Sequence, residues 1–339
     1  MTPLSNWVFT CFYETQIPER CLSVQSHSYS RDKSMQNFFK LAAVAALCST
    51  AVAAHAELSL DANLELDTTY TNAVDAPASN ARESDLGMGG RVEFNVGAKA
   101  TNGDAFVAAR ASLLLKKDGD TGMDDMWVQF GNAGMDLKLG RFEAYDLFPV
   151  GKDTVVEYAG YTPYQANMLR GRKGRDVAHG ALGVNAAPGL RFELGLVYSK
   201  DEGEARGIRP AVGYTTGPLT LRAGVESVKV VGSDASTENG VGLSVGYALS
   251  KDSNINVNFA KKEDDKTIGI NAIIGAAGIG LVHGKGATSA DKVTTVYAAY
   301  SLPLFGVKGA TITPALSYSK GGTGTDDQVA VRARINYAF

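Results

Sequence analysis

Apolar and polar residues alternate along most of the chain from residue 57 onward. In the first segment, the polar positions Ser59, Asp61, Asn63, Glu65 and Asp67 alternate with the apolar positions Leu58, Leu60, Ala62, Leu64 and Leu66. A period of two predicts a β-strand with one apolar and one polar face. The same pattern returns in many later segments, so we expect an all-β protein.

The alternating segments are short and are separated by turn residues. They lie near residues 57–67, 91–99, 107–116, 126–130, 136–139, 175–187, 190–196, 208–216, 219–230, 241–249, 255–259, 268–274, 279–283, 293–302, 312–318 and 329–339. Tight turns are expected at 101–104, 131–134, 188–189 and 217–218, and a polar loop near 72–84. This gives about sixteen strands, spaced roughly eighteen residues apart, as in outer-membrane barrels.

The strands keep one polar face throughout, and several of the polar residues are Arg or Glu near mid-strand. A soluble sandwich would turn such faces to outside water, and a chain of this length would have one or two dense cores. Closing about sixteen strands instead places the polar face on a water-filled lumen and the apolar face on lipid. We therefore predict a transmembrane antiparallel β-barrel.

One stretch interrupts this pattern. Asp136–Arg175 begins as a strand and continues for about thirty residues without a period, which inside a compact domain is typical of a functional loop. It is rich in Gly, Pro, Tyr and charged residues. We expect it to fold into the barrel and constrict the lumen.

The N-terminal residues resemble an export signal. Residues 35–40 supply a short positive region, residues 41–52 an apolar stretch, and Ala54-His55-Ala56 a small-x-small cleavage pattern. We expect a signal peptide at 35–56 and a barrel domain at 57–339. Residues 1–34 fit no part of an exported protein, so Met35 is the expected translation start and 1–34 a misannotated extension.

Composition narrows the function further. The formal net charge of −3 gives no basic excess for nucleic acid. The three cysteines, Cys11, Cys21 and Cys48, all precede residue 57, so the expected mature chain has neither a disulfide nor a cysteine metal site. Outside the N-terminal segment there is no apolar run long enough for a membrane helix. We expect no cofactor and no bound metal.

The last strand ends on an aromatic residue. Val329, Val331, Ala333, Ile335, Tyr337 and Phe339 share one face of residues 329–339. This pattern resembles the assembly signal of bacterial outer-membrane barrels, which implies that the barrel assembly machinery recognises Phe339.

The barrel segment resembles the Gram-negative trimeric porins, most clearly at Trp127–Arg141. There a strand, a tight turn and a second strand end in Gly-Arg before the long loop. The resemblance implies a homotrimer in outer-membrane lipid and lipopolysaccharide, and a lumen role for Arg141 opposite loop acids. The Pro-Glu-Phe-Gly-Gly element of general porins is missing, and Asp146–Glu157 stands in its place, more like sugar-specific glycoporins of the raffinose type.

Strand parity gives a set of basic residues on the expected lumen face: Arg91, Arg110, Arg191, Arg209, Arg222, Arg332 and Arg334. Arg141 shares parity with outward Leu137 and Leu139, so it reaches the lumen only if the strand bulges or bends there. Asp146, Asp153 and Glu157 are the candidate loop carboxylates. Arginines facing such acids would create a transverse field, although the acids could also be solvated at the rim.

Aromatic residues in the loop allow two interpretations. Tyr145, Phe148, Tyr158, Tyr161 and Tyr164 could form a track for sugar rings, or pin the loop to the wall by burial. A second aromatic set has outward parity and is typical of a membrane-interface girdle. It comprises Tyr214, Tyr247, Tyr300, Tyr318 and Tyr337.

The expected function is passive diffusion of small hydrophilic solutes and ions across the outer membrane. The sequence is compatible with both a general pore and a sugar-selective pore. The acidic run Asp118–Asp125 hints at weak calcium or lipopolysaccharide binding but lacks an EF-hand pattern. A barrel enzyme would need a positioned histidine, and His179 and His283 stand in no recognisable triad. An adhesive barrel would favour fewer strands and a plugged lumen.

Overall fold

The computed structural model describes residues 56–339 except 76–80, 175, 233–236, 289–290 and 322–326. The described residues belong to one compact unit, residues 52–339. The expected upstream segment at 1–34 lies outside the described residues, as does the expected signal peptide apart from Ala56. No helix in the described part of the chain is both long and apolar enough to cross a membrane.

Every regular element in the described ranges is a β-strand. The strands are β1 (Ala56–Asp75), β2 (Ala81–Asn102), β3 (Ala105–Lys116), β4 (Thr121–Gly131), β5 (Met135–Arg141), β6 (Ala178–Ala187), β7 (Leu190–Tyr198), β8 (Ala205–Thr216), β9 (Leu219–Val230), β10 (Glu238–Ser250), β11 (Ser253–Lys262), β12 (Asp265–Ile274), β13 (Ala277–Lys285), β14 (Lys292–Tyr300), β15 (Leu302–Pro303), β16 (Ala310–Gly321) and β17 (Asp327–Ala338).

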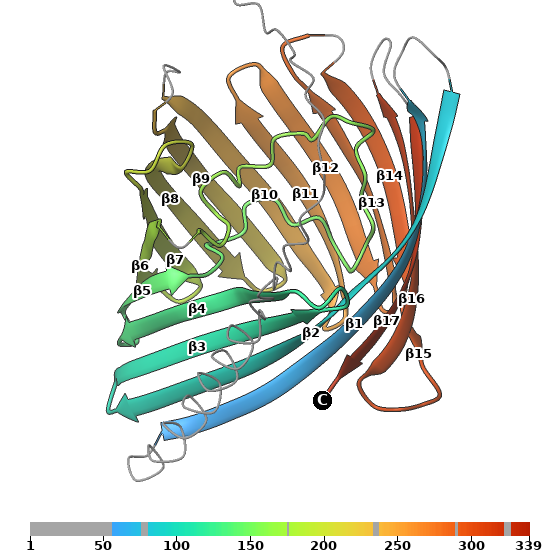
Figure 1. The fold of residues 1–339 in the computed structure, drawn as a ribbon. Coiled ribbons are helices and arrows are strands. Elements are labelled where there is room, and N and C mark those ends of the chain that lie inside the picture. The colour runs from blue at the N-terminus through green and yellow to red at the C-terminus, as the bar shows by residue number, and fades with distance from the viewer. Residues whose placement is uncertain (1–55, 76–80, 175, 233–236, 289–290, 322–326) are drawn as a thin grey trace, which may run out of the picture. The chain divides into compact units, whose positions relative to one another are not determined.

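The strands close into one antiparallel barrel. Each strand pairs with its sequence neighbours, and β1 pairs with both β2 and β17, which closes the sheet. β14 and the two-residue β15 both pair with β16 and together form one interrupted strand of the barrel. Counted in this way, the barrel has sixteen strands. Figure 1 shows the strands tilted around a common axis. The predicted all-β antiparallel barrel is confirmed.

The first hairpin is longer than the sequence pattern predicts. A polar loop was expected near 72–84, but β1 and β2 stay paired up to Asp75 and Ala81. β3 accompanies β2 only as far as Arg91, opposite Lys116, so residues 81–90 extend beyond their neighbour. The prediction of a loop at 72–75 and 81–84 is wrong. A strand that extends beyond the apolar outer surface of the barrel needs no apolar face, so the alternation of residues fades while the strand pairing continues.

The two faces of the wall differ as the alternation predicts. The outer face carries exposed apolar side chains on most strands, among them Leu60, Phe94, Leu243, Ile270 and Val331. The five tyrosines of outward parity are also exposed, Tyr214, Tyr247, Tyr300, Tyr318 and Tyr337. The inner face carries amides, hydroxyls and charges.

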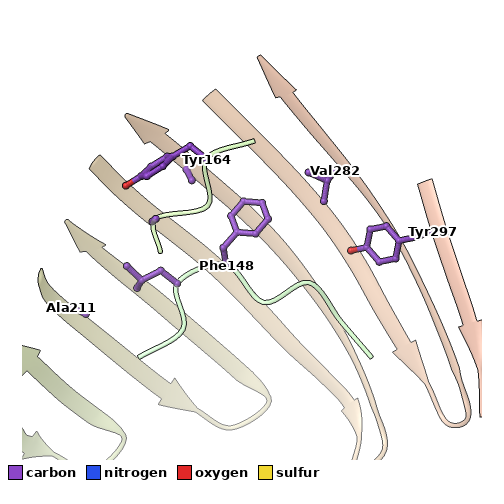
Figure 2. Close-up of a cluster of buried hydrophobic side chains, with 8 residues drawn as sticks. Phe148, Tyr164, Ala211, Val282 and Tyr297 are labelled. Carbon is purple, nitrogen blue, oxygen red and sulfur yellow. The ribbon is translucent and has the colours of Figure 1, made fainter. Parts of the chain in front are cut away.

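Residues 142–177, which we call the inward loop, join β5 to β6, and the described residues among them form neither helix nor strand. In Figure 1 its green trace crosses β10–β13 inside the barrel. Its side chains make the main buried cluster of the described chain, in which Leu147, Phe148, Tyr164 and Ala166 contact wall residues. In Figure 2, Phe148 and Tyr164 of the loop lie over the strands between the one that carries Ala211 and the one that carries Val282. The apolar core therefore lies between loop and wall.

Candidate pore interior

Uncharged side chains of the wall hold the middle of the inward loop. The amide nitrogens of Asn258 and Asn271 each donate to the carbonyl of Pro149 at 2.7 Å. The Tyr297 hydroxyl donates to the carbonyl of Val150 at 2.7 Å. Because a loop lacks strand partners, these bonds satisfy backbone groups that would otherwise be buried without partners.

The same arrangement continues toward β16 and β17. The hydroxyls of Thr295 and Ser319 both donate to the carbonyl of Glu157. The amide of Ala159 donates to the Gln328 side-chain oxygen at 2.8 Å. Glu157, a predicted lumen acid, is thus held through its main chain.

A buried ion pair anchors the returning half of the loop. Glu226 on β9 accepts bonds from the Tyr164 hydroxyl at 2.6 Å and from the amides of Met168 and Leu169 at 3.1 Å. Arg209 on β8 lies 3.6 Å from Glu226 and donates to the carbonyl of Ala166 at 3.1 Å. Burial, and then the nearby Glu226 carboxylate, raise the pKa of Tyr164, so this hydroxyl stays a donor.

Glycines on the inner face let the loop approach the wall. An added side chain at Gly242 would place its Cβ 2.6 Å from Ala166 Cβ and 2.9 Å from Leu147 Cβ. The equivalent atom at Gly284 would lie 2.3 Å from Pro163 Cβ, and at Gly269 3.0 Å from Phe148. We call Gly242, Gly269 and Gly284 the glycine bed. Any larger residue at these positions of β10–β13 would occupy the space in which the loop packs.

The two ends of the loop are fastened to each other. The amide of Ala144 donates to the carbonyl of Arg170 at 2.9 Å. Arg170 and Arg172 lie 3.1 and 3.3 Å from the two carboxylate oxygens of Glu143. We call these contacting residues at the two ends of the loop, Glu143, Ala144, Arg170 and Arg172, the loop neck. Because the loop ends contact each other, the shape of the loop does not depend on the wall alone.

Arg141 lies beside the loop neck. Its Nε donates to the carbonyls of Met123 and Asp124, and its Nη1 to the carbonyl of Lys173 at 2.6 Å. Arg141 was expected to reach the lumen only through a bulge or a bend of the strand, and the β4–β5 ladder is regular through this residue, without a bulge. The preceding Gly140 instead has φ of +120°, a conformation that favours glycine and turns the chain as the loop begins.

A β-bulge occurs instead in the neighbouring strand pair, between β3 and β4. Ala111 pairs with Met126 and Leu113 pairs with Met123, so Ser112 faces both Asp124 and Asp125. A bulge adds a residue and redirects side chains. Both carboxylates meet Arg172 of the loop neck, at 3.1 Å from Asp124 and 2.7 Å from Asp125.

The wall arginines of β2 and β3 have acidic neighbours on the same face. Arg91 lies 3.2 Å from Glu65 and 3.7 Å from Glu93. Arg110 lies 3.9 Å from Glu93 and 3.8 Å from Asp125. Their side chains are 40% and 38% exposed, so this part of the inner wall is open to solvent.

Two arginines of β17 meet the loop directly. Arg334 Nη1 lies 2.8 Å from Asp153, and Arg332 Nη2 lies 3.4 Å from the same carboxylate. Arg334 also makes a two-point contact with Asp67 of β1, both distances being 2.7 Å. The structure therefore brings these two predicted arginines together with one predicted loop acid.

The remaining predicted arginines are placed differently. Arg191 makes a two-point contact with Asp136, at 2.8 and 3.1 Å. Arg209 is covered by the loop and only 1% exposed. Arg222 donates to Ser244 at 3.4 Å. Only part of the predicted set lies where water reaches it.

The other predicted loop residues divide between buried and half-buried positions. Asp146 accepts from the amide of Phe148 and lies 3.7 Å from Arg170. Phe148 and Tyr164 are buried, while Tyr145 and Tyr158 are half-buried against the same cluster. The Tyr161 hydroxyl donates to Asp265 at 3.3 Å, and burial together with that carboxylate raises its pKa to about 12.

The two histidines in the described ranges, His179 and His283, make contacts that differ from those of an acid–nucleophile triad. His179 stacks on Phe142 with ring centroids 4.1 Å apart and is buried. His283 contacts the Thr294 hydroxyl through Nδ1 at 2.8 Å. Across the described ranges, no three His, Cys, Asp or Glu side chains are grouped to hold a metal ion.

Sequence reasoning missed two features that were visible in the pattern. Glu65, Asp67, Glu93 and Asp125 share the polar faces with the arginines, yet only loop acids were considered as their partners. Inward-parity glycines are concentrated on β8–β13, which marks the wall where the loop lies. Both follow from strand parity once it is applied to acids and glycines as well as to arginines.

Comparison with known proteins agrees with this architecture. The family model described as porin-like glycoporin RafY matches residues 53–177. None of the curated protein sequences matches the chain significantly.

Solved porins have the same fold at low sequence identity. A loop-deletion mutant of OmpT, an outer membrane protein of Vibrio cholerae, is 17% identical with a TM-score of 0.61. An anion-selective porin from Comamonas acidovorans is 17% identical with a TM-score of 0.60, and a mutant porin of Rhodopseudomonas blastica 14% identical with a TM-score of 0.55. Each comparison covers 84% of this chain and 100% of the other. The chain therefore has the sixteen-stranded barrel fold of these solved porins, and its residues 53–177 are similar to the porin-like glycoporin family.

Proposed function

We propose that the protein is an outer-membrane channel through which small hydrophilic solutes and ions diffuse passively. The observation that carries this proposal is the contrast between two parts of the inner wall. Thr295 and Ser319, under the loop, are 0% exposed, whereas Arg91 and Arg110 on β2 and β3 are more than a third exposed. The loop thus fills one side and leaves a charged, solvent-accessible strip on the other.

The chemistry of both faces supports this function. An exposed apolar outer face is stable in hydrocarbon, and a closed barrel leaves no strand edge unsatisfied there. A polar inner face provides hydrogen-bond partners for water and solutes. Transport by such a pore needs no bound cofactor and no chemical step, so we propose a channel rather than an enzyme or an adhesin.

Planar-bilayer recording of the purified protein tests this proposal. We expect stepwise, long-lived conductance increments in potassium chloride, and swelling of proteoliposomes in small sugars that declines as the sugars become larger. A folded barrel that adds no conductance and no swelling would contradict the proposal.

A sugar-preferring pore is the second candidate, favoured by the glycoporin family match over residues 53–177. Tyr145, Tyr158 and Tyr161 are half-buried rather than buried, so their rings keep some access to solute. Ion current that a trisaccharide blocks at low concentration supports a binding site. Current that is unaffected supports a general pore.

The setting of the channel follows from the same proposal. We infer a homotrimer in the Gram-negative outer membrane, surrounded by lipid and lipopolysaccharide and exported by its signal peptide. The exposed Phe339 at the end of the closing strand is the proposed contact for the barrel assembly machinery.

A further inference from the structure

The charges of the inner wall are connected in a single alternating sequence. A shared carboxylate within 4.0 Å bridges each arginine to the next in the order Arg170, Arg172, Arg110, Arg91, Arg334 and Arg332. We call these arginines and their bridging carboxylates the charge belt.

The belt runs around the part of the wall that the loop leaves open. Starting from Asp146 on the loop, it passes through the loop neck to Asp125 on β4. It continues through Arg110 and Glu93 to Arg91 and Glu65 on β1. From Glu65 it passes through Arg334 and returns to the loop at Asp153. Both ends of the belt therefore lie on the inward loop.

Positive and negative charges that alternate along the belt produce a different electric field from charges of opposite sign on opposite walls. Two facing rows of opposite sign produce a field across the whole passage. Charges that alternate at contact distance cancel within a few ångströms, well inside the screening length of about 8–10 Å at physiological ionic strength. A passing ion meets neighbouring charges of both signs at every point of the belt.

The count of charges agrees with near cancellation. Six arginines are joined to eight carboxylates through these contacts, an excess of two negative charges. The bulge on β4 contributes to this balance, because it delivers Asp124 and Asp125 together to Arg172.

We propose that the charge belt makes the passage nearly indifferent to the sign of an ion, and that each member is a specificity-determining residue because its loss unbalances the belt. This inference rests on the proposed channel function. It differs from the transverse field expected from the sequence, since each wall arginine of the belt is neutralised by an acid beside it.

Reversal potentials in a potassium chloride gradient test the inference. For the unaltered protein we expect a permeability ratio of potassium to chloride within about threefold of one, slightly favouring potassium because of the two excess carboxylates. Arg110→Gln should shift the ratio toward potassium, and Glu93→Gln toward chloride, each by about twofold or more.

The double variant Arg110→Gln/Glu93→Gln is the matched control. It removes one charge of each sign from neighbouring positions and should return the ratio to that of the unaltered protein. Arg91→Gln and Glu65→Gln form a second pair, should one variant fail to fold.

The outcomes separate this inference from the function on which it rests. A folded protein without conductance contradicts the channel itself. A conducting protein that strongly prefers one sign, or single variants that leave the ratio unchanged, overturns the charge-belt inference and leaves the channel intact.

Discussion

The carboxylate of Asp153 in the inward loop lies 2.8 Å from Nη1 of Arg334 on the last strand. The loop begins after β5, so this contact joins parts of the chain 181 residues apart. It places the loop across the barrel from its own stem. A loop acid and a wall arginine are in direct contact here, rather than facing each other across water.

The position of the loop can be tested with a disulfide. An added Cβ at Gly278 on β13 would lie 3.2 Å from Lys152 Cβ, close to the separation of about 3.5–4.5 Å in disulfides. We expect Lys152→Cys/Gly278→Cys to form an intramolecular disulfide under mild oxidation, detected as a mobility change on denaturing gels that a reductant reverses.

The natural cysteines all precede residue 57, so they do not compete within the barrel. Lys152→Cys/Gly89→Cys is the control, because Gly89 lies on β2 with nothing near its added Cβ. Cross-linking of the control, or its absence in the first pair, would contradict this placement of the loop.

The glycine bed predicts a specific packing defect. Gly242→Val would press against Ala166 and Leu147 of the loop, and overpacking of this kind costs about 1–3 kcal/mol. Because the strand backbone is held on both sides, we expect the loop to move toward the passage and the single-channel conductance to fall.

Gly89→Val provides the comparison, since it introduces the same side chain on the inner face of a strand that the loop does not cover. It should leave both conductance and denaturant stability close to those of the unaltered protein. Equal effects of the two substitutions would show that the bed does not determine loop position.

Glu226 should contribute more to loop attachment than any single hydrogen bond. Glu226→Gln leaves Arg209 buried without its counter-ion, and breaking a buried pair costs about 3–5 kcal/mol. Tyr164→Phe removes only one hydrogen bond to this carboxylate, worth about 1.5–3 kcal/mol. Urea unfolding in detergent, followed by tryptophan fluorescence, measures both.

A second readout distinguishes loop release from general unfolding. We expect Glu226→Gln to increase protease cleavage between residues 142 and 177 while the barrel keeps its heat-modifiable mobility. Identical cleavage in the glutamine variant and in Tyr164→Phe would be inconsistent with the ion pair as the main anchor.

Phe339 combines a backbone role with a side-chain role, and two variants separate them. Its amide and carbonyl bond with Ala62 on β1 at 2.9 and 2.8 Å, and its ring lies 5.1 Å from that of Tyr337. We expect deletion of Phe339 to weaken barrel closure in vitro. Phe339→Ala keeps the backbone bonds and should lower only the yield of assembled barrel in cells.

The two variants are compared by refolding yield in detergent and by the heat-modifiable fraction in outer membranes. If Phe339→Ala assembles in cells as well as the unaltered protein, the aromatic ring is not the proposed recognition signal.

The barrel was predictable because its cause is local. A strand with lipid on one side and water on the other must alternate, so Leu219–Val230 could be read directly from the pattern, and the turns at 188–189 and 217–218 from glycine and proline. The upper part of β1 and β2 was missed because, beyond the apolar belt, pairing continues without alternation.

Parity of residues on a strand also gave the inner position of the arginines, but not what lies beside each one. Arg91, Arg110 and Arg209 all occupy inward positions of their strands. The side chains of Arg91 and Arg110 are 40% and 38% exposed, whereas Arg209 is buried under the loop. The difference arises from the path of the inward loop, which meets Arg209 through Ala166, 43 residues away along the chain, and Arg334 through Asp153, 181 residues away.

Alternation along the sequence was sufficient to establish the barrel, its inner and outer faces and the presence of a long irregular connection. The wall that this connection covers, the bulge that brings Asp124 and Asp125 to Arg172, and the alternating order of the belt were decided by the tertiary structure. The physical reason is distance along the chain: a strand pattern depends on neighbours two residues apart, whereas loop docking and charge pairing depend on strands that meet only when the sheet closes.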